Sequence, residues 1–282
     1  MILSIKDFIT LTKFRLSFVV TSSMVFSFIL IKESISIQLL APFIAVLLLA
    51  LGVSALNQYQ EYEEDAKMQR TKHRPIASNK ITPQQGLRIS ILLIAISFLT
   101  IYFSLEFIGI YIFISVIVLY NFVYTKIKKT TVYAAVYGAV LGITPPMIGW
   151  LAGGGDIYDI RFFAIALFYF IWQIPHFWLL ILKYHKQYHI AGFPTVAQEF
   201  GIQRLERITF IWLLLTVICG VFVFLAFPIR SDMVFVLFLL LVIYTLYSIF
   251  SLLKTHKYIK VFVASNIYIT FTMCLLTFNI LL

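Results

Sequence analysis

The sequence predicts an all-α membrane protein that crosses the lipid bilayer many times. Of its 282 residues, 61% are hydrophobic and only 12% are charged, and the mean hydropathy is +0.97. A water-soluble fold of this size needs about twice that charged fraction, and a disordered chain has far fewer large apolar residues. Because lipid offers no partner for backbone N–H and C=O groups, long apolar runs in a membrane are helical.

Nine apolar runs are long enough to cross a hydrocarbon core of about 30 Å. They cover roughly residues 15–31, 37–57, 87–105, 107–123, 131–152, 162–183, 207–227, 233–253 and 259–281. The prolines Pro145 and Pro146 should kink the fifth run. No linker is long enough to separate two domains, so residues 1–282 are predicted to form one bundle of nine transmembrane helices.

The distribution of basic residues predicts the orientation. With the N-terminus in the cytoplasm, all but three of the 22 Lys and Arg residues lie inside, the exceptions being Lys32, Arg161 and Arg230. This asymmetry is typical of the cytoplasmic side, and an odd number of spans places the C-terminus outside. No removable signal or transit peptide is expected, which favours a bacterial cytoplasmic membrane.

The formal charge of +10 does not form one basic stripe with interleaved aromatic residues. We therefore expect the lipid bilayer, and no nucleic acid, as the surroundings of this chain. The two long polar loops, 58–86 and 184–206, share the cytoplasmic side. Chemistry is expected there.

The first of these loops carries a regular set of oxygen-bearing side chains. Asn57, Glu61 and Asp65 fall at i, i+4 and i+8, which on a continuing helix places them on one face along about 12 Å. Mg²⁺ prefers oxygen ligands and is usually held by one or two carboxylates plus substrate phosphates. An asparagine still within an apolar run is also costly unless it has a function. The spacing predicts a magnesium site.

Basic residues follow the carboxylates. Arg70, Lys72 and Arg74 supply cations for the same anion, and Pro75 should end the helix. The alternative is that an amphipathic helix end carries mixed charges because it meets the lipid head groups. We expect that role for three other charged residues, Glu63, Glu64 and Lys67.

At this point the residues resemble the N-x-x-x-D-x-x-x-D region of the UbiA-type intramembrane prenyltransferases. The continuation N-x-x-x-[DE]-x-x-x-D-x-x-M-x-R-T-x-x-R-P, here residues 57–75, is similar to the heme O synthase (protoheme IX farnesyltransferase) branch. Further blocks of that branch are similar to L-T-K-F-R at 11–15, Y-T-K-I-K-K at 124–129, G-I-T-P-P-M-I-G-W at 142–150, W-Q-I-P-H-F-W at 172–178 and A-G-F-P at 191–194. The resemblance covers about residues 9–195.

The resemblance implies that a farnesyl group passes from farnesyl diphosphate to a vinyl group of heme b. It implies Mg²⁺ as cofactor, with Asn57, Glu61 and Asp65 as catalytic metal ligands, and a downstream heme-modifying enzyme as a candidate partner. An allylic diphosphate ionises when Mg²⁺ and cations take up the charge of the leaving group, and its carbocation must be kept from water. The expected diphosphate-binding residues are Arg70, Lys72, Arg74, Lys126 and Lys186.

Two departures from the family pattern affect the site. Glu61 stands where the family usually has Asp, one methylene shorter. Lys186 and Gln187 stand where the family generally has acidic residues, and Glu199 could replace those acids only if its loop folds back. Three alternatives follow: diphosphate binding depends on one metal ion at the first motif, it depends on Lys186 directly, or the activity is altered.

An ionisable side chain within a predicted span indicates a function by default. His176 could face the heme iron or orient a propionate, with Gln173 one turn earlier in the same role. The alternative is a histidine hydrogen-bonded to a neighbouring helix. Asn121 and Tyr124 close the fourth span near the same rim and are expected to line the pocket.

Two other functions are open at this stage. A related enzyme that prenylates a quinone precursor or another aromatic compound would share most of these features. A membrane transporter could use nine spans and an intramembrane histidine, but the paired broken helices typical of transporters are not evident.

Overall fold

The computed structural model describes residues 4–282, apart from the side chain of Lys254, and contains helices but no strand in that range. The first half comprises α1 (Ile5–Leu11), α2 (Phe14–Lys32), η1 (Ile37–Leu39), α3 (Leu40–Gln60), α4 (Tyr62–Lys67) and α5 (Pro83–Ile117), followed by the π-helical η2 (Val118–Tyr124) and α6 (Thr125–Ile127). The second half comprises α7 (Ala134–Leu141), α8 (Thr144–Ala152), α9 (Ile160–Ile190), α10 (Val196–Phe200), α11 (Ile202–Leu225), α12 (Asp232–Thr255) and α13 (Tyr258–Leu281).

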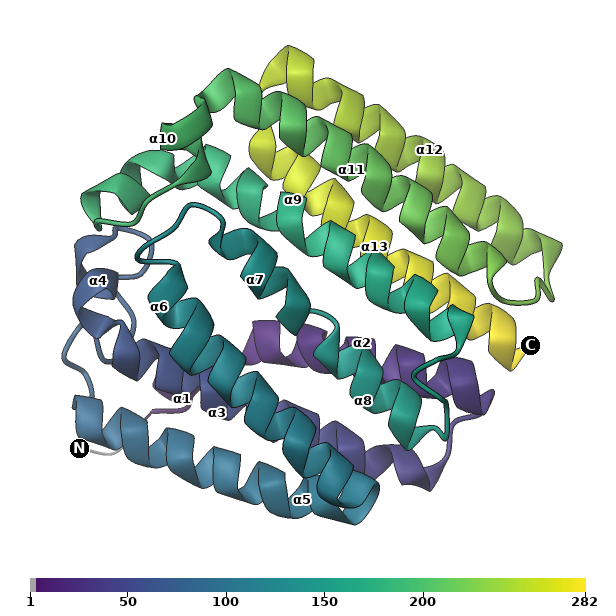
Figure 1. The fold of residues 1–282 in the computed structure, drawn as a ribbon, viewed down its shortest axis with the longest axis horizontal. Coiled ribbons are helices and arrows are strands. Elements are labelled where there is room, and N and C mark those ends of the chain that lie inside the picture. Colours follow the sequence, from purple (N-terminus) through teal and green to yellow (C-terminus); the bar gives the residue numbers. More distant parts are fainter. Residues whose placement is uncertain (1–3) are drawn as a thin grey trace.

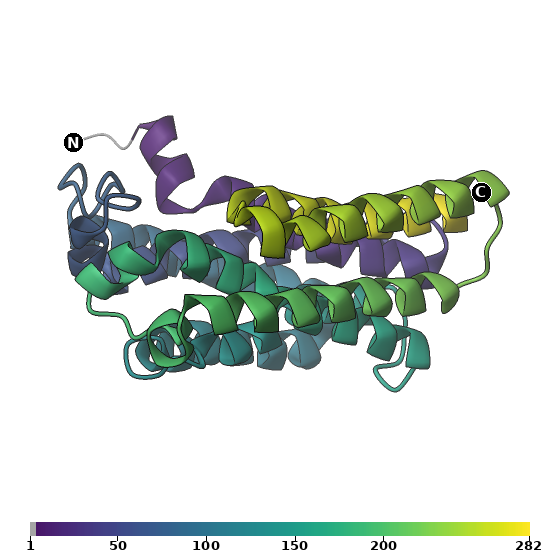
Figure 2. The same ribbon diagram turned by 90° about the horizontal axis from the view of Figure 1, so that it is seen from above.

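The long helices lie side by side in one bundle (Figure 1). Within the described residues, eight helical segments are long and apolar enough to cross a membrane. One end of the bundle carries the short helices α1, α4 and α10, and we call it the loop end. The C-terminus lies at the other end (Figures 1 and 2). The two polar loops predicted to share one side therefore do share one end.

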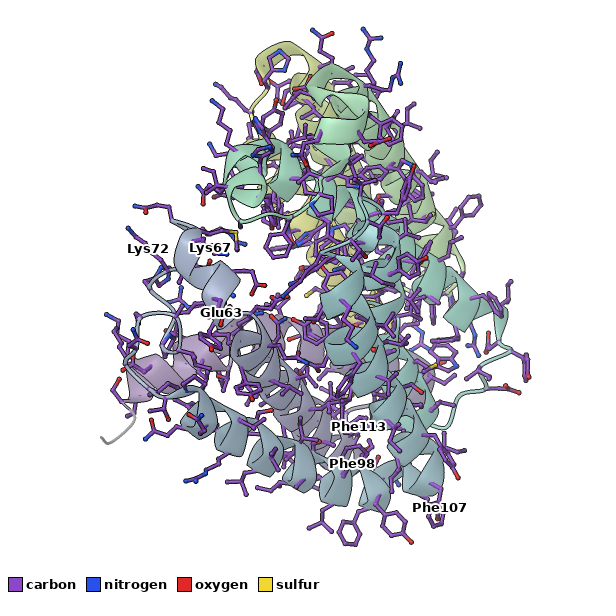
Figure 3. All side chains as sticks on the ribbon, turned by 60° about the vertical axis from the view of Figure 1, so that its left-hand side comes forward. Glu63, Lys67, Lys72, Phe98, Phe107 and Phe113 are labelled. Carbon is purple, nitrogen blue, oxygen red and sulfur yellow. The ribbon has the colours of Figure 1, made fainter. Side chains whose placement is uncertain are left out.

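One of the eight segments, Pro83–Ile127, has 45 residues, and as a straight helix it would measure about 68 Å, more than twice the hydrocarbon core. It folds back at Glu106, whose φ of 47° and ψ of −135° are not helical. The rings of Phe98 and Phe113 pack edge to face with centroids 5.9 Å apart, whereas a straight helix would separate them by about 22 Å along its axis. Figure 3 shows these two rings close together, with Phe107 near the turn. The reversal falls at the residue between the third and fourth predicted spans.

The fifth predicted span is broken rather than kinked. Its two parts, α7 and α8, meet at Gly142 and Ile143. Pro145 and Pro146 lie just beyond, in the first turn of α8, where a missing N–H leaves no hydrogen bond unmade. The prolines therefore begin a new helix instead of bending an existing one.

Close helix crossings hold the two halves together. A Cβ atom on Gly149 would lie 2.0 Å from the carbonyl oxygen of Met24, so α8 and α2 touch backbone to backbone. Within the second half, a Cβ on Gly220 would lie 2.2 Å from the hydroxyl of Tyr268, so this side chain of α13 packs directly on the backbone of α11. Only glycine permits such approaches. Many large apolar side chains on the outside of the bundle are exposed, as a lipid-facing surface requires.

Two boundaries near the loop end differ from the sequence prediction. Helix α3 ends at Gln60, and Glu61, with φ −127° and ψ 15°, separates it from α4, so Asn57, Glu61 and Asp65 do not share one continuing helix. Since α3 already has the length of the hydrocarbon core, a continued helix would carry both carboxylates into water, whereas the break keeps them buried. Helix α9 continues to Ile190 through a non-helical Tyr184, so the predicted loop 184–206 begins as helix.

Candidate functional site

Charged and amide side chains from separate segments meet at the loop end. Asn57 lies in the last turn of α3, Glu61 at the break and Asp65 in α4, and all three are buried. Basic residues reach them from the α1–α2 corner, from the loop after α4 and from the loop after α6. We call these six residues the charged cluster: Lys13, Asn57, Glu61, Asp65, Arg74 and Lys128.

Each oxygen-bearing residue of the cluster has one basic partner. Lys13 Nζ donates to Asn57 Oδ1 at 2.8 Å, and the amide nitrogen of Asn57 lies 3.4 Å from Thr125 Oγ1. Lys128 Nζ lies 2.5 Å from a carboxylate oxygen of Glu61. The side chains of two different loops therefore close on α3 and on the residue that follows it.

The third pair is the most enclosed. Arg74 Nη1 donates to both carboxylate oxygens of Asp65, at 2.7 and 2.6 Å. The hydroxyl of Thr71 also donates to the backbone carbonyl of Asp65 at 2.9 Å. The loop after α4 is thus a series of turns wrapped around Asp65, and not the predicted helix running to Pro75.

Lys13 is held in an uncommon conformation. Its φ of 49° and ψ of 43° are left-handed, which costs a non-glycine residue about 1–2 kcal/mol. Burial, together with the positive charges of Arg74 and Lys128, lowers the pKa of its ammonium to about 7, although the two carboxylates act in the opposite direction. Such strain and such a pKa shift are typical of functional sites.

The charges and donor atoms of the cluster fit a magnesium ion with a diphosphate. Arg74 and Lys128 pair with the two carboxylates, and Lys13 adds one positive charge when it is protonated. Mg²⁺ with a fully ionised prenyl diphosphate carries one negative charge. Two carboxylates and an amide are the hard oxygen donors that Mg²⁺ prefers. Across residues 4–282, no group of three or more His, Cys, Asp or Glu side chains could hold a metal ion alone. Phosphate and water oxygens would have to complete the coordination shell.

Arg70 contacts the end of α9 and so bridges the two polar loops. Its backbone N–H donates to Gln187 Oε1 at 3.3 Å, and its Nη2 lies 3.5 Å from the hydroxyl of Tyr188. Its guanidinium lies 5.8 Å from the ring centroid of Tyr184. The two arginines predicted to act together therefore have different partners. Arg74 pairs with Asp65 in the cluster, and Arg70 lies against the end of α9.

Three predicted phosphate-binding lysines are not brought to the cluster. The side chains of Lys72, Lys126 and Lys186 are exposed, and Figure 3 shows Lys72 extending outward beside Lys67. Glu199 is also exposed, on α10, and does not take the place of the missing acidic residues. Gln187 faces the first loop instead, through its contact with Arg70.

His176 packs in an aromatic box within α9 and α13. Its ring centroid lies 4.6 Å from that of Trp172 and 4.6 Å from that of Phe262. Its Nδ1 is buried and has no hydrogen-bond partner among the described residues, so this nitrogen does not make the hydrogen bond to a neighbouring helix that was one alternative. Gln173 reaches the break in the fifth span, where its Oε1 would lie 3.4 Å from a Cβ on Gly142.

The π-helical segment η2 connects the cluster to the bundle interior. Asn121 is buried there and donates to Gln60 Oε1 at 3.0 Å, and its own Oδ1 is buried without a partner in the described part of the chain. Tyr124 stacks on Phe177 at 6.3 Å, and the ammonium of Lys128 lies 5.5 Å from the centroid of the Tyr124 ring. π-helical insertions are frequent at functional sites, and here the insertion places one polar and one aromatic residue beside the cluster.

Lys13 and Lys128 were missed by the sequence analysis of the site. The spacing of Asn121, Tyr124 and Lys128 could have identified Lys128, because positions three and four apart share a helix face while Lys126 lies on another. No local pattern identifies Lys13, whose position depends on contacts between segments more than forty residues apart in the sequence.

A surface cavity of about 480 Å³ lies next to the start of α11. It is lined by Phe200 and by residues of the following turn, and none of them belongs to the cluster.

Comparison with known proteins identifies the family of this chain and supports its fold. The sequence model of the UbiA prenyltransferase family matches residues 18–272. The protoheme IX farnesyltransferase of Bartonella henselae is 31% identical over 221 residues, which cover 77% of this chain and 70% of that protein. The protoheme IX farnesyltransferase of Alcanivorax borkumensis is 28% identical over 237 residues, which cover 82% of this chain and 77% of that protein.

Solved structures share the fold. A UbiA homolog from Archaeoglobus fulgidus, bound to GPP and Mg²⁺, superposes with a TM-score of 0.73 at 16% identity and covers 98% of this chain and 99% of its own. A digeranylgeranylglyceryl phosphate synthase has the same TM-score at 15% identity, with 98% of each chain covered. The helical fold, the apolar segments and the family signature together show that this chain is a multi-pass membrane enzyme of the UbiA prenyltransferase family.

Proposed function

We propose that this enzyme joins a farnesyl group from farnesyl diphosphate to a vinyl group of heme b, and that one water molecule then supplies the hydroxyl group, forming heme O and releasing diphosphate and a proton. The observation that carries the proposal is the charged cluster, which buries oxygen donors and cations together at the end of an apolar bundle. The relatives that share about 30% identity over most of the chain and bear the name protoheme IX farnesyltransferase support heme as the acceptor.

The magnesium ion would be held by Asn57, Glu61 and Asp65, on the side of the cluster that faces the diphosphate. Mg²⁺, when bound, neutralises charge on the departing diphosphate. The basic side chains that now pair with these ligands would turn to the phosphate oxygens, since the metal takes over their role at the carboxylates. Each cation of the cluster thus has one partner without substrate and another with it.

Aromatic rings lie where the allylic carbocation would form. Tyr120 and Tyr124 stack with centroids 5.9 Å apart, and Tyr124 continues the stack to Phe177. The faces of such rings stabilise a nearby cation and exclude water. We place the first isoprene unit of the substrate against this stack, beside Lys128.

The acceptor would approach from the side of α9. His176 has a buried nitrogen without a partner, and such a group is costly unless a ligand completes it. We propose that His176 and Gln173 contact the porphyrin, by the iron or by a propionate. The vinyl group would then meet the carbocation between α9 and η2.

We further propose nine membrane crossings, with the N-terminus and both polar loops in the bacterial cytoplasm and the C-terminus outside. The reversal at Glu106 supports this count, because it divides the 45-residue segment into two limbs that are each long enough to span. The loops 58–86 and 184–206 would then cover the site from the cytoplasm.

The direct test supplies heme b, farnesyl diphosphate and Mg²⁺ to the purified protein in liposomes, followed by mass spectrometry of the extracted heme. We expect heme carrying a hydroxyethylfarnesyl group, and none with Asp65→Asn. Unchanged heme, together with farnesylation of an added quinone precursor, would show that the acceptor is wrong while the prenyltransferase activity stands.

A further inference from the structure

Gln58 follows Asn57 directly on α3 and contacts the backbone of the α1–α2 corner. Its side chain is buried, and its Nε2 donates to the backbone carbonyls of Thr10 at 2.7 Å and Leu11 at 3.0 Å. These carbonyls belong to the last turn of α1, where a helix leaves its acceptors without partners of its own. A side chain of α3 therefore completes the C-terminus of α1.

The chain turns sharply just after these carbonyls. Lys13 adopts its left-handed conformation at this corner, and α2 begins at the next residue. The Lys13 N–H donates to the Thr10 carbonyl at 3.3 Å, so the carbonyl that Gln58 holds is part of the turn itself. At the other end of the same residue, Lys13 Nζ donates to Asn57 Oδ1. Two consecutive residues of α3 thus hold the corner. Gln58 binds the backbone carbonyls of the corner, and Asn57 binds the side-chain ammonium of Lys13.

The chemistry of Gln58 argues against a purely space-filling role. Its Oε1 is buried and has no partner among the described residues. A buried acceptor without a hydrogen bond lowers stability, and an apolar side chain of the same size would avoid that penalty. The amide is therefore best explained by what its two donated hydrogen bonds hold in place.

We propose that Gln58 is a positioning residue that sets the α1–α2 corner so that the Lys13 ammonium faces the diphosphate site. This rests on the proposed function of the charged cluster. A strained residue keeps its conformation only while its surroundings determine it. Without the Gln58 amide, the corner relaxes and the ammonium leaves the cluster, although the helices still pack.

A double-mutant cycle tests the proposal with three variants, Gln58→Met, Lys13→Met and the double variant. Binding of farnesyl diphosphate in the presence of Mg²⁺ is measured by calorimetry on detergent-purified protein. We expect each single variant to bind about tenfold more weakly, as residues that orient a ligand group commonly do. The double variant should be no weaker than Lys13→Met alone, because Gln58 acts only through Lys13.

Asn279 offers a matched control, since it is also a buried amide that holds a chain corner, at the opposite end of the bundle. It donates to the Pro228 carbonyl at 2.7 Å and accepts from the Arg230 N–H at 2.9 Å. Asn279→Leu should lower the melting temperature and leave the affinity for farnesyl diphosphate unchanged. Should Gln58→Met not fold, Gln58→Asn, which keeps the amide on a shorter side chain, takes its place in the cycle.

Losses that add up in the double variant would overturn the proposal. So would a Gln58→Met protein that resembles Asn279→Leu, with lower stability and full affinity. A wild-type protein that binds no farnesyl diphosphate would instead refute the proposed function, so the two failures are distinguishable.

Discussion

At the loop end of the bundle, the side chains of Glu61 and Asp65 are 5% and 3% exposed, and each is paired with a basic residue. At the opposite end, the side chain of Glu33 is 46% exposed and pairs with Arg230. Exposed ion pairs contribute about 0–1 kcal/mol to stability, whereas taking each charge out of water costs several kcal/mol. The outer pair therefore needs no special explanation, and the buried pairs do.

The proposed diphosphate site explains why charge is buried at the loop end. Buried ion pairs are a poor source of stability compared with apolar packing, so stability alone does not account for three basic side chains beside two carboxylates. When a charged substrate binds such a site, the basic side chains can move from the carboxylates to the substrate, and the oxygen donors can bind its metal ion. Substitutions at the two ends should accordingly affect different properties, catalysis at one and marginal stability at the other.

The largest effect is expected for Asp65→Asn. We expect prenyl transfer to fall by at least about 100-fold, equivalent to about 2.7 kcal/mol, because a metal ligand is lost. Stability should also fall, since Arg74 loses its charged partner. The variant Asp65→Asn combined with Arg74→Gln should recover the melting temperature but not the rate. If this double variant recovered activity as well, the pair would be purely structural.

Lys128→Met should come next. It leaves Glu61 buried without a cation and removes a phosphate contact, so affinity for farnesyl diphosphate should fall about 10- to 100-fold, or about 1.4–2.7 kcal/mol. Lys126→Met, two residues earlier on the exposed face, is the matched control and should stay near wild type in the same binding assay. Equal losses in the two variants would contradict the assignment of Lys128.

Arg70→Ala should have a smaller effect, because its guanidinium touches the rings of α9 and not the cluster. The loss of such a cation–aromatic contact is worth about 0.5–1 kcal/mol, which corresponds to a few-fold rise in KM for farnesyl diphosphate. Limited proteolysis should cut the segment 184–206 faster. A loss as large as that of Lys128→Met would show that Arg70 grips the diphosphate directly, as the sequence suggested.

Glu33→Gln should have the smallest effect. The exposed pair with Arg230 should change the free energy of unfolding by about 0–1 kcal/mol, and the rate of prenyl transfer should not change. Thermal melting and steady-state assays on the same preparation measure both quantities. A marked loss of activity would mean that the outer end is coupled to the site, which the comparison of the two ends denies.

Much of the fold follows from the sequence because lipid leaves few choices for an apolar chain. The apolar runs predicted the long helices, and the single charged residue Glu106 between two runs coincides with the reversal inside α5. The breaks at Gly142 and Glu61 were not predicted. At the first, Pro145 and Pro146 begin a new helix where the sequence analysis expected only a kink. At the second, Glu61 pairs with Lys128, a contact between distant segments that no local pattern reveals.

The sequence predicted which oxygen donors meet in the charged cluster better than which cations do. Asn57, Glu61 and Asp65 lie together as their spacing suggested, although on a broken helix. Basic residues are numerous at the loop end, and only the folded chain shows that Lys13 and Lys128 pair inside the cluster while Lys72, Lys126 and Lys186 are exposed. Charge type is local information, but the direction of a long flexible side chain is not.

The most direct test of the account is the binding of farnesyl diphosphate to the purified protein, with and without Mg²⁺, in wild type and in the variant Asp65→Asn/Arg74→Gln. The account predicts binding that Mg²⁺ strengthens in the wild type, and loss of that dependence in a variant that melts at nearly the same temperature. Binding indifferent to Mg²⁺ in the wild type, or equally dependent on it in the variant, would contradict the claim that the buried charges form a magnesium diphosphate site.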